Sequence, residues 1–302
     1  MAGQAPGGPR RAAAGCTDGR TGRRRHGTAL LAALLVAAGA GRAAAQTPDQ
    51  PNLIFTISGG YITGGTLWTL PRQLALATAT GNGTAWDTVA LGRRMRPGFT
   101  ATLSATVFFS PHLGYSAEVG FFGIGTTSQC SPVGPWTPTA DDANEIACDV
   151  LNGDNMRSDA VGLLGGLTWR FTRGGVQPYL RAMIGPAILG ASFVEEATPI
   201  VAANSNTSLV YFLSDQNHKE LSWMLSLGAG VMMPLSPGYQ LRLEVRDLLI
   251  PLPYPTGPAT DTAAIAGESA LPQPPVAFRL MHLPSITVGL DVVLERKRGH
   301  RY

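Results

Sequence analysis

The chain has 302 residues, of which 44% are hydrophobic, only 14% are charged and 37 are glycine. This much apolar sequence excludes an intrinsically disordered chain, and abundant glycine with sparse charge is typical of a fold rich in strands and turns. The basic net charge comes from the first 45 residues, and the remainder has more acidic than basic residues, so a nucleic-acid-binding protein is not expected.

Residues 1–45 have the pattern of a secretory signal peptide. A basic cluster at Arg23–Arg25 precedes an apolar run from Ala29 to Gly41, and Ala43–Ala45 supplies small residues for cleavage before Gln46. The apolar run is too short for a transmembrane helix, which needs about 20 residues. We therefore expect an exported protein that is cleaved after residue 45.

After Gln46, eight segments alternate between apolar residues and polar or small ones, the period-two pattern of strands with two different faces. In the clearest segment, Phe99, Leu103 and Val107 share one face, whereas Thr100, Thr102 and Ser104 share the other. The expected strands are residues 53–61, 99–109, 113–124, 160–171, 176–190, 221–233, 239–247 and 285–294.

Short and long connections alternate strictly between these strands. Three are tight turns with proline or glycine, at residues 110–112, 172–175 and 234–238, where these residue types supply turn geometry. Four are long, at residues 61–97, 125–159, 191–220 and 250–284. Such long loops are uncommon inside compact soluble domains, but outer-membrane barrels have short periplasmic turns and long extracellular loops.

The pattern predicts an all-β fold, an eight-stranded antiparallel up-and-down transmembrane β-barrel with four long extracellular loops and three short periplasmic turns. In hydrocarbon every backbone polar group must be paired, so the strands must form a closed sheet with apolar residues outside. The barrel domain is expected over residues 46–294 and a basic periplasmic tail over residues 295–302, with both termini in the periplasm. A soluble lipocalin-like barrel is the alternative, and it would place the apolar face inside.

Three local motifs resemble those of the OmpA-like small outer-membrane β-barrel family of Gram-negative bacteria. They are the hairpin of residues 227–247, Pro178–Arg181 leading to Gly185, and Gly59–Tyr61 closing the first strand. The resemblance implies a largely filled barrel interior, and the barrel-assembly machinery as a partner during insertion. One departure is the end of the last strand at Leu294, where such barrels usually end on an aromatic residue.

Opposite charges fall on the inward face and define an expected lumen charge network. Pairing is the expected solution because an unpaired charge inside the barrel would be costly, and Arg242 and Asp291 lie on neighbouring strands. A gated polar path for small solutes is the alternative, although eight strands leave little space beyond their own side chains. The network comprises Glu118, Arg170, Arg181, Arg242, Glu244, Arg246 and Asp291.

Two features belong to the long connections. Cys130 and Cys148 form an even pair in an exported chain, which favours a disulfide. Arg93, Arg94 and Arg96 enter the second strand from outside, at the height of lipopolysaccharide phosphates, and arginine pairs well with phosphate. We therefore expect these arginines to contact lipopolysaccharide.

No catalytic, cofactor or metal site is expected. The acidic loop from Asp141 to Asp154 matches no calcium-loop spacing. His282 and Ser285 lie near the top of the last strand without an evident acidic partner, so a lipid-modifying enzyme is the least favoured reading. The expected function is a structural or surface-interaction role in the outer membrane, with the extracellular partner unspecified. Narrow porin-like passage of small solutes is the alternative.

Overall fold

The computed structural model describes residues 52–78, 84–138, 142–153, 155–172, 174–201, 207–216, 218–261 and 271–294. The chain separates into two compact units, residues 1–42 and 43–302, and everything described here belongs to the second. The expected signal peptide, residues 1–45, and the expected tail, residues 295–302, lie outside the described residues. No helix in the described part of the chain is long and apolar enough to cross a membrane.

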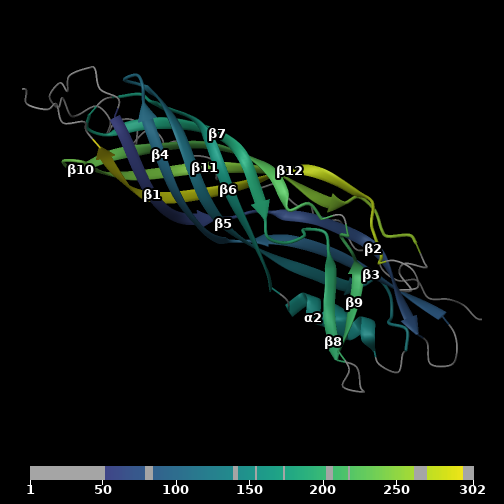
Figure 1. Ribbon diagram of the computed structural model, residues 1–302. Coiled ribbons are helices and arrows are strands. Elements are labelled where there is room, and N and C mark those ends of the chain that lie inside the picture. Colours follow the sequence, from purple (N-terminus) through teal and green to yellow (C-terminus); the bar gives the residue numbers. More distant parts are fainter. Residues whose placement is uncertain are drawn as a thin grey trace, which may run out of the picture. The chain divides into compact units, whose positions relative to one another are not determined.

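Eight antiparallel strands form a closed ring, which is prominent in Figure 1. The first strand of the chain, β1, pairs with β4 on one side and with the last strand, β12, on the other, while β5 pairs with β6 to complete the circuit. The ring strands are β1 (Asn52–Ile62), β4 (Gly98–Phe108), β5 (Leu113–Pro132), β6 (Asn155–Arg170), β7 (Gln177–Leu189), β10 (Leu221–Ser236), β11 (Tyr239–Pro255) and β12 (Val276–Leu294).

The register shows that the ring is narrow. A path through residues paired across neighbouring strands starts at Leu249 on β11, crosses every ring strand once and returns to β11 at Tyr239, ten residues away. In an eight-stranded barrel this stagger corresponds to a strand tilt of roughly 40–45°, and the interior is just wide enough to be filled by side chains.

The two faces of the ring differ as the alternation predicts. Along β4, Thr100, Thr102 and Ser104 are buried inside, whereas Phe99 and Leu103 are exposed outside. The exposed outer belt continues around the ring through Ile57, Tyr61, Val119, Phe121, Leu163, Trp169, Ile184, Trp223, Val245 and Ile286. A soluble lipocalin-like barrel would have the opposite polarity, so that alternative is wrong.

All eight expected strands are present, and the tight turns connect β4 to β5, β6 to β7 and β10 to β11. The end of the ring that carries these turns is called the turn end below. Four ring strands, β5, β6, β11 and β12, extend beyond their expected limits at the other end of the ring.

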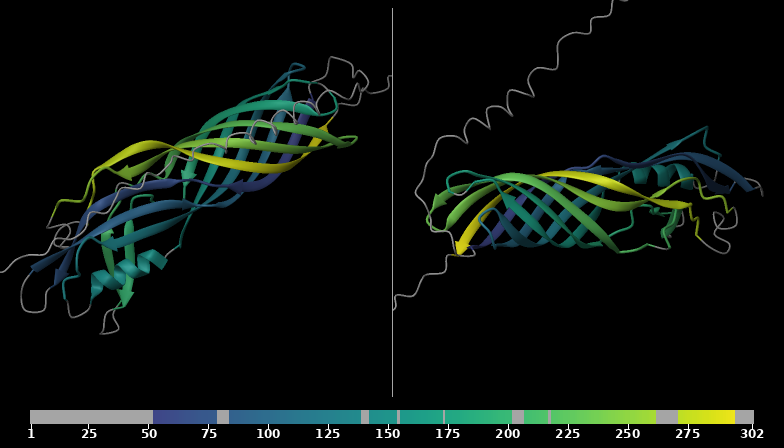
Figure 2. Two further views of the ribbon diagram at one scale, coloured as in Figure 1. Left: turned by 180° about the vertical axis from the view of Figure 1, so that it is seen from behind. Right: turned by 90° about the horizontal axis from the view of Figure 1, so that it is seen from above.

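The long connections contain regular elements that the sequence analysis did not predict. They are β2 (Thr66–Thr78), β3 (Thr84–Arg96), α2 (Ala143–Gly153), β8 (Glu196–Val201) and β9 (Thr207–Leu213). The hairpin β2–β3 joins the extended part of β5, where β3 occupies the edge that β4 has left. These elements and the extended parts of β5, β11 and β12 are called the crown below, and Figure 2 shows them gathered beyond the ring.

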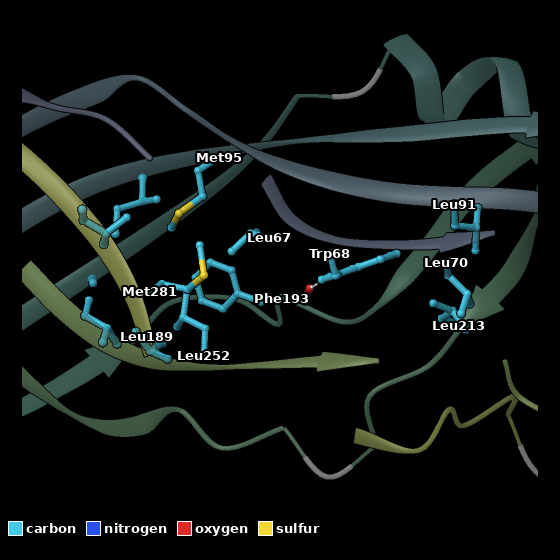
Figure 3. Close-up of a cluster of buried hydrophobic side chains, with 14 of the residues drawn as sticks. Leu67, Trp68, Leu70, Leu91, Met95, Leu189, Phe193, Leu213, Leu252 and Met281 are labelled. Atoms are coloured by element: carbon cyan, nitrogen blue, oxygen red, sulfur yellow. Dashed lines mark hydrogen bonds between the residues drawn. The ribbon is translucent and has the colours of Figure 1, made fainter. Parts of the chain in front are cut away.

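The crown has its own hydrophobic core. Trp68 from β2, Leu91 from β3 and Phe193 from the segment before β8 are buried together with Leu213 and Leu252 (Figure 3). This core continues into the ring, where Phe122, Leu164, Met183 and Met224 belong to the same cluster. Apolar residues that looked like loop sequence therefore stabilise an ordered structure by burial.

Candidate functional site

Apolar side chains fill the interior at the turn end. Ile54, Phe108, Tyr179 and Met232 come from four different strands, are all buried, and pack together with Val293. Tyr179 also donates its hydroxyl proton to Glu244 Oε2 at 2.6 Å. This layer therefore closes the turn end and fixes one carboxylate of the polar layer next to it.

Two arginines and two glutamates form a charge cluster in the middle of the ring. Arg181 lies 3.0 Å from Glu118 and 2.8 Å from Glu244, and Arg246 lies 2.6 Å from Glu118 and 3.3 Å from Glu244. All four side chains are buried. Because each charge has two opposite partners, the cluster is electrically neutral and holds strands β5, β7 and β11 together.

A second ion pair lies beside this cluster. Arg242 Nε donates to Asp291 Oδ1 at 3.0 Å, and the Thr56 hydroxyl donates to the same oxygen at 2.7 Å. The guanidinium also lies over the Tyr179 ring, with Cζ 5.2 Å from its centroid. Together with the four-residue cluster, three arginines face three carboxylates inside the ring.

Glycines on the inward face of β10 provide the space for these side chains. A Cβ atom at Gly228 would lie 2.5 Å from Glu244 Oε1, and one at Gly230 would lie 2.7 Å from the Tyr179 hydroxyl. Both contacts are closer than real Cβ atoms make. The narrow interior therefore holds its charge network only because this strand carries no side chain at those positions.

Arg170 lies apart from the other six residues of the expected lumen charge network. Its Nε donates to Pro111 O at 2.6 Å, and its guanidinium lies 4.0 Å from the centroid of the Phe108 ring. Arg170 ends β6 at the turn connecting it to β7, whereas the other six expected residues lie deeper in the ring. The structure thus brings together six of the seven residues and places Arg170 against the β4–β5 turn.

The crown closes the opposite end of the ring. Trp68 Nε1 donates to Phe193 O at 2.8 Å, as drawn in Figure 3, and Arg93 Nε lies 3.0 Å from Glu196 Oε1. Arg93 also donates to Ser192 O. These contacts fix the segment before β8 against β2 and β3, over the apolar layer that contains Met183 and Met224.

The expected contact of Arg93 with lipopolysaccharide is wrong because this side chain is fully buried in the crown. Alternation along β3 points Arg93 inward, whereas Arg94 and Arg96 are exposed. The group of three arginines is therefore divided between the two faces of one strand.

The expected disulfide between Cys130 and Cys148 is present, and it joins β5 to α2. Asn152 on the same helix supports this link, because its side-chain amide donates to Cys130 O and accepts from Cys130 N. No group of three or more metal-ligating side chains occurs among the residues that the structure describes.

His282 has an acidic partner that the sequence analysis missed. His282 Nδ1 lies 2.7 Å from Asp247 Oδ2, on the outside of the barrel. Ser285, the other member of the considered pair, is buried on the inward face. The sequence could have predicted the outward position of Asp247, because it follows Leu243 and Val245 at every second residue of the same strand.

Comparisons with known proteins find only distant similarity to solved structures. No family model and no curated protein matches the chain. Among solved structures, the Neisserial surface protein A is similar at 10% identity and a TM-score of 0.36, covering 82% of this chain and 99% of that one. OprG of Pseudomonas aeruginosa is similar at 11% identity and a TM-score of 0.40, covering 82% and 97%.

The Ail protein of Yersinia pestis, solved with a heparin analogue, is similar at 9% identity and a TM-score of 0.28, covering 82% of this chain and 100% of that one. The assignment of the fold is made on the strand pairing of this chain itself. That pairing defines a closed, eight-stranded antiparallel β-barrel with an ordered crown.

Proposed function

We propose that this protein is an integral outer-membrane β-barrel of a Gram-negative bacterium, with a structural or surface-interaction role. The observation that carries the proposal is the exposed apolar belt around a closed ring whose interior contains a buried charge cluster. Water disfavours so large a continuous apolar surface, whereas a bilayer requires one together with full backbone pairing. The three motifs of the sequence support placement in the OmpA-like group.

The orientation follows from the two ends of the ring. The short turns, the start of β1 and the end of β12 share one end, which we assign to the periplasm, and the crown then lies outside the cell. This arrangement agrees with short periplasmic turns and larger extracellular segments. Insertion by the barrel-assembly machinery is part of the same proposal.

The surface role is favoured over passage of solutes. An apolar layer, a neutral charge cluster and the core of the crown follow one another along the interior, so a solute would have to displace buried and paired groups at each level. The crown presents an ordered surface on a rigid scaffold, the kind of position where recognition is usual. We assign no enzymatic activity, because Ser285 and His282 face opposite sides of the wall.

Contact with lipopolysaccharide is proposed for Arg94 and Arg96 alone. Both are exposed on β3 where it leaves the level of the belt. Their guanidinium groups can form bidentate hydrogen bonds with phosphate oxygens.

Thiol labelling tests whether the interior is closed. Ser226 is buried inside the ring, and the native Cys130 and Cys148 are joined in a disulfide, so Ser226→Cys introduces a distinct reactive group. We expect a small water-soluble maleimide to label it at least about 100-fold more slowly than Val133→Cys on the exposed crown, because reaction requires local unfolding. Equal labelling rates in the folded protein would support the porin-like alternative instead.

A further inference from the structure

One ionic pair interrupts the apolar outer wall. The outer belt runs from the turn end to the level of Tyr61 and Trp223. Among the described residues of the eight strands, Asp247 is the one charged side chain that points outward within this belt. His282, its partner, lies four residues nearer the crown than Ile286, which pairs with Tyr61. The pair therefore lies at the outer edge of the belt, where the hydrocarbon ends.

The geometry of this pair leaves hydrogen-bonding capacity for a ligand. Asp247 Oδ2 is 2.7 Å from His282 Nδ1, while the histidine side chain remains 65% exposed. With Nδ1 engaged by the carboxylate, Nε2 is the ring nitrogen available to a partner. It accepts from a hydroxyl when the ring is neutral and donates to an anionic oxygen when the ring is protonated.

An apolar groove of about 790 Å³ leads along the outer wall to this pair. Small side chains form its floor, since Ala182 lies between Leu167 and Leu227 on the neighbouring strands and Ala229 lies between Leu180 and Val245. Trp169 lines the groove toward the turn end, and Asp247 and His282 line it toward the crown. Its lining and its place on the belt suit a hydrocarbon chain.

A second pocket, lined by both apolar and charged side chains, lies further along the same strands. It has a volume of about 310 Å³ and is lined by Asp215, Lys219, Leu221 and Phe278, among others. Phe278 is four residues beyond His282 on β12, about 13 Å along an extended strand. The groove, the ionic pair and this second pocket thus follow one another across β10, β11 and β12.

We propose that this face binds one glycolipid molecule. An acyl chain occupies the groove, sugar hydroxyls meet Asp247 and His282, and the rest of a phosphorylated sugar head group reaches the pocket with Lys219. A glycolipid is favoured over a phospholipid because the polar part of the site is extended and holds a carboxylate, an imidazole and an ammonium group. The inference rests on the proposed location in the outer membrane and adds a specific lipid site to it.

The test is native mass spectrometry of the mature protein in detergent, after incubation with lipid A or with phosphatidylethanolamine. We expect one retained lipid A per barrel and no comparable retention of phosphatidylethanolamine. Ala229→Leu fills the groove and should reduce the retained lipid A about 10-fold. Asp247→Asn should do the same, because it keeps the shape of the side chain and removes the carboxylate. The control is Ala105→Leu, the same change at an outward alanine on β4, which should retain lipid A as the wild type does.

Equal retention by Ala229→Leu and Ala105→Leu, or equal retention of the two lipids, would overturn the inference. A gel-shift assay of each variant, with and without heating, shows whether the barrel forms. If the wild type forms no barrel, the proposed function fails. If the barrel forms but the variants retain as much lipid A as the wild type, only the lipid site fails.

Arg94→Ala with Arg96→Ala should weaken adhesion to lipopolysaccharide vesicles, unlike Arg72→Ala, while keeping the lipid retained in detergent. Unchanged adhesion would remove the proposed arginine contact.

Discussion

Replacing Glu118 by alanine should lower the free energy of unfolding by about 3–5 kcal/mol. Glu118 contacts both Arg181 and Arg246 inside the ring, so its loss leaves two buried guanidinium groups facing the single carboxylate of Glu244. The desolvation of these charges is then no longer offset by pairing. Urea-induced unfolding of the protein in detergent, followed by tryptophan fluorescence, measures the change.

The matched control for this variant is Glu145→Ala, an exposed glutamate on α2, which should change the stability by at most about 0.5 kcal/mol. The double variant Glu118→Ala with Arg246→Ala should cost less than the sum of its two single changes, because it removes one charge of each sign. A Glu118→Ala protein as stable as the Glu145→Ala protein would show that the cluster does not hold the interior together.

Replacing Leu103 by arginine should cost about 2–4 kcal/mol, although this side chain is already exposed. Leu103 lies in the middle of β4 and pairs with Ile57 and Val119, which are also exposed on the outer wall. A soluble barrel would tolerate arginine at an exposed position. The size of the loss in stability therefore distinguishes lipid from water around the belt. Folding into lipid vesicles, with the unfolding equilibrium measured in urea, gives the value.

Val133→Arg is the control for the lipid-facing change. Val133 is exposed on the crown just beyond β5, where the proposed orientation places it in water, and the substitution should be nearly neutral. Similar costs for Leu103→Arg and Val133→Arg would contradict the assignment of the belt to the hydrocarbon.

The ring could be predicted from sequence because its strands have two chemically different faces. In residues 99–109 and 239–247, period-two alternation identified both the strand and the side on which each residue lies. The same parity would have separated buried Arg93 from exposed Arg94 and Arg96, and it would have placed Asp247 outside. Those residues lay at or beyond the edges of the expected strands, where parity was not applied.

The crown could not be predicted in the same way because its elements are buried through contacts distant in sequence. Trp68 packs with Phe193, and Arg93 pairs with Glu196, so neither local pattern shows the burial. β2 also contains Pro71, a residue that disfavours assignment to a strand. The pairing of His282 with Asp247 was missed for a related reason, since β12 begins at Val276, before the expected start at residue 285.

The central claim is a closed barrel that requires a membrane-like environment, and its most direct test is the electrophoretic mobility of the mature protein before and after boiling in detergent. A closed barrel with every strand edge paired should resist the detergent until heated, so the unboiled band should migrate differently from the boiled one. Coincident bands, from a protein that remains soluble without detergent, would contradict the closed ring and the outer-membrane assignment together.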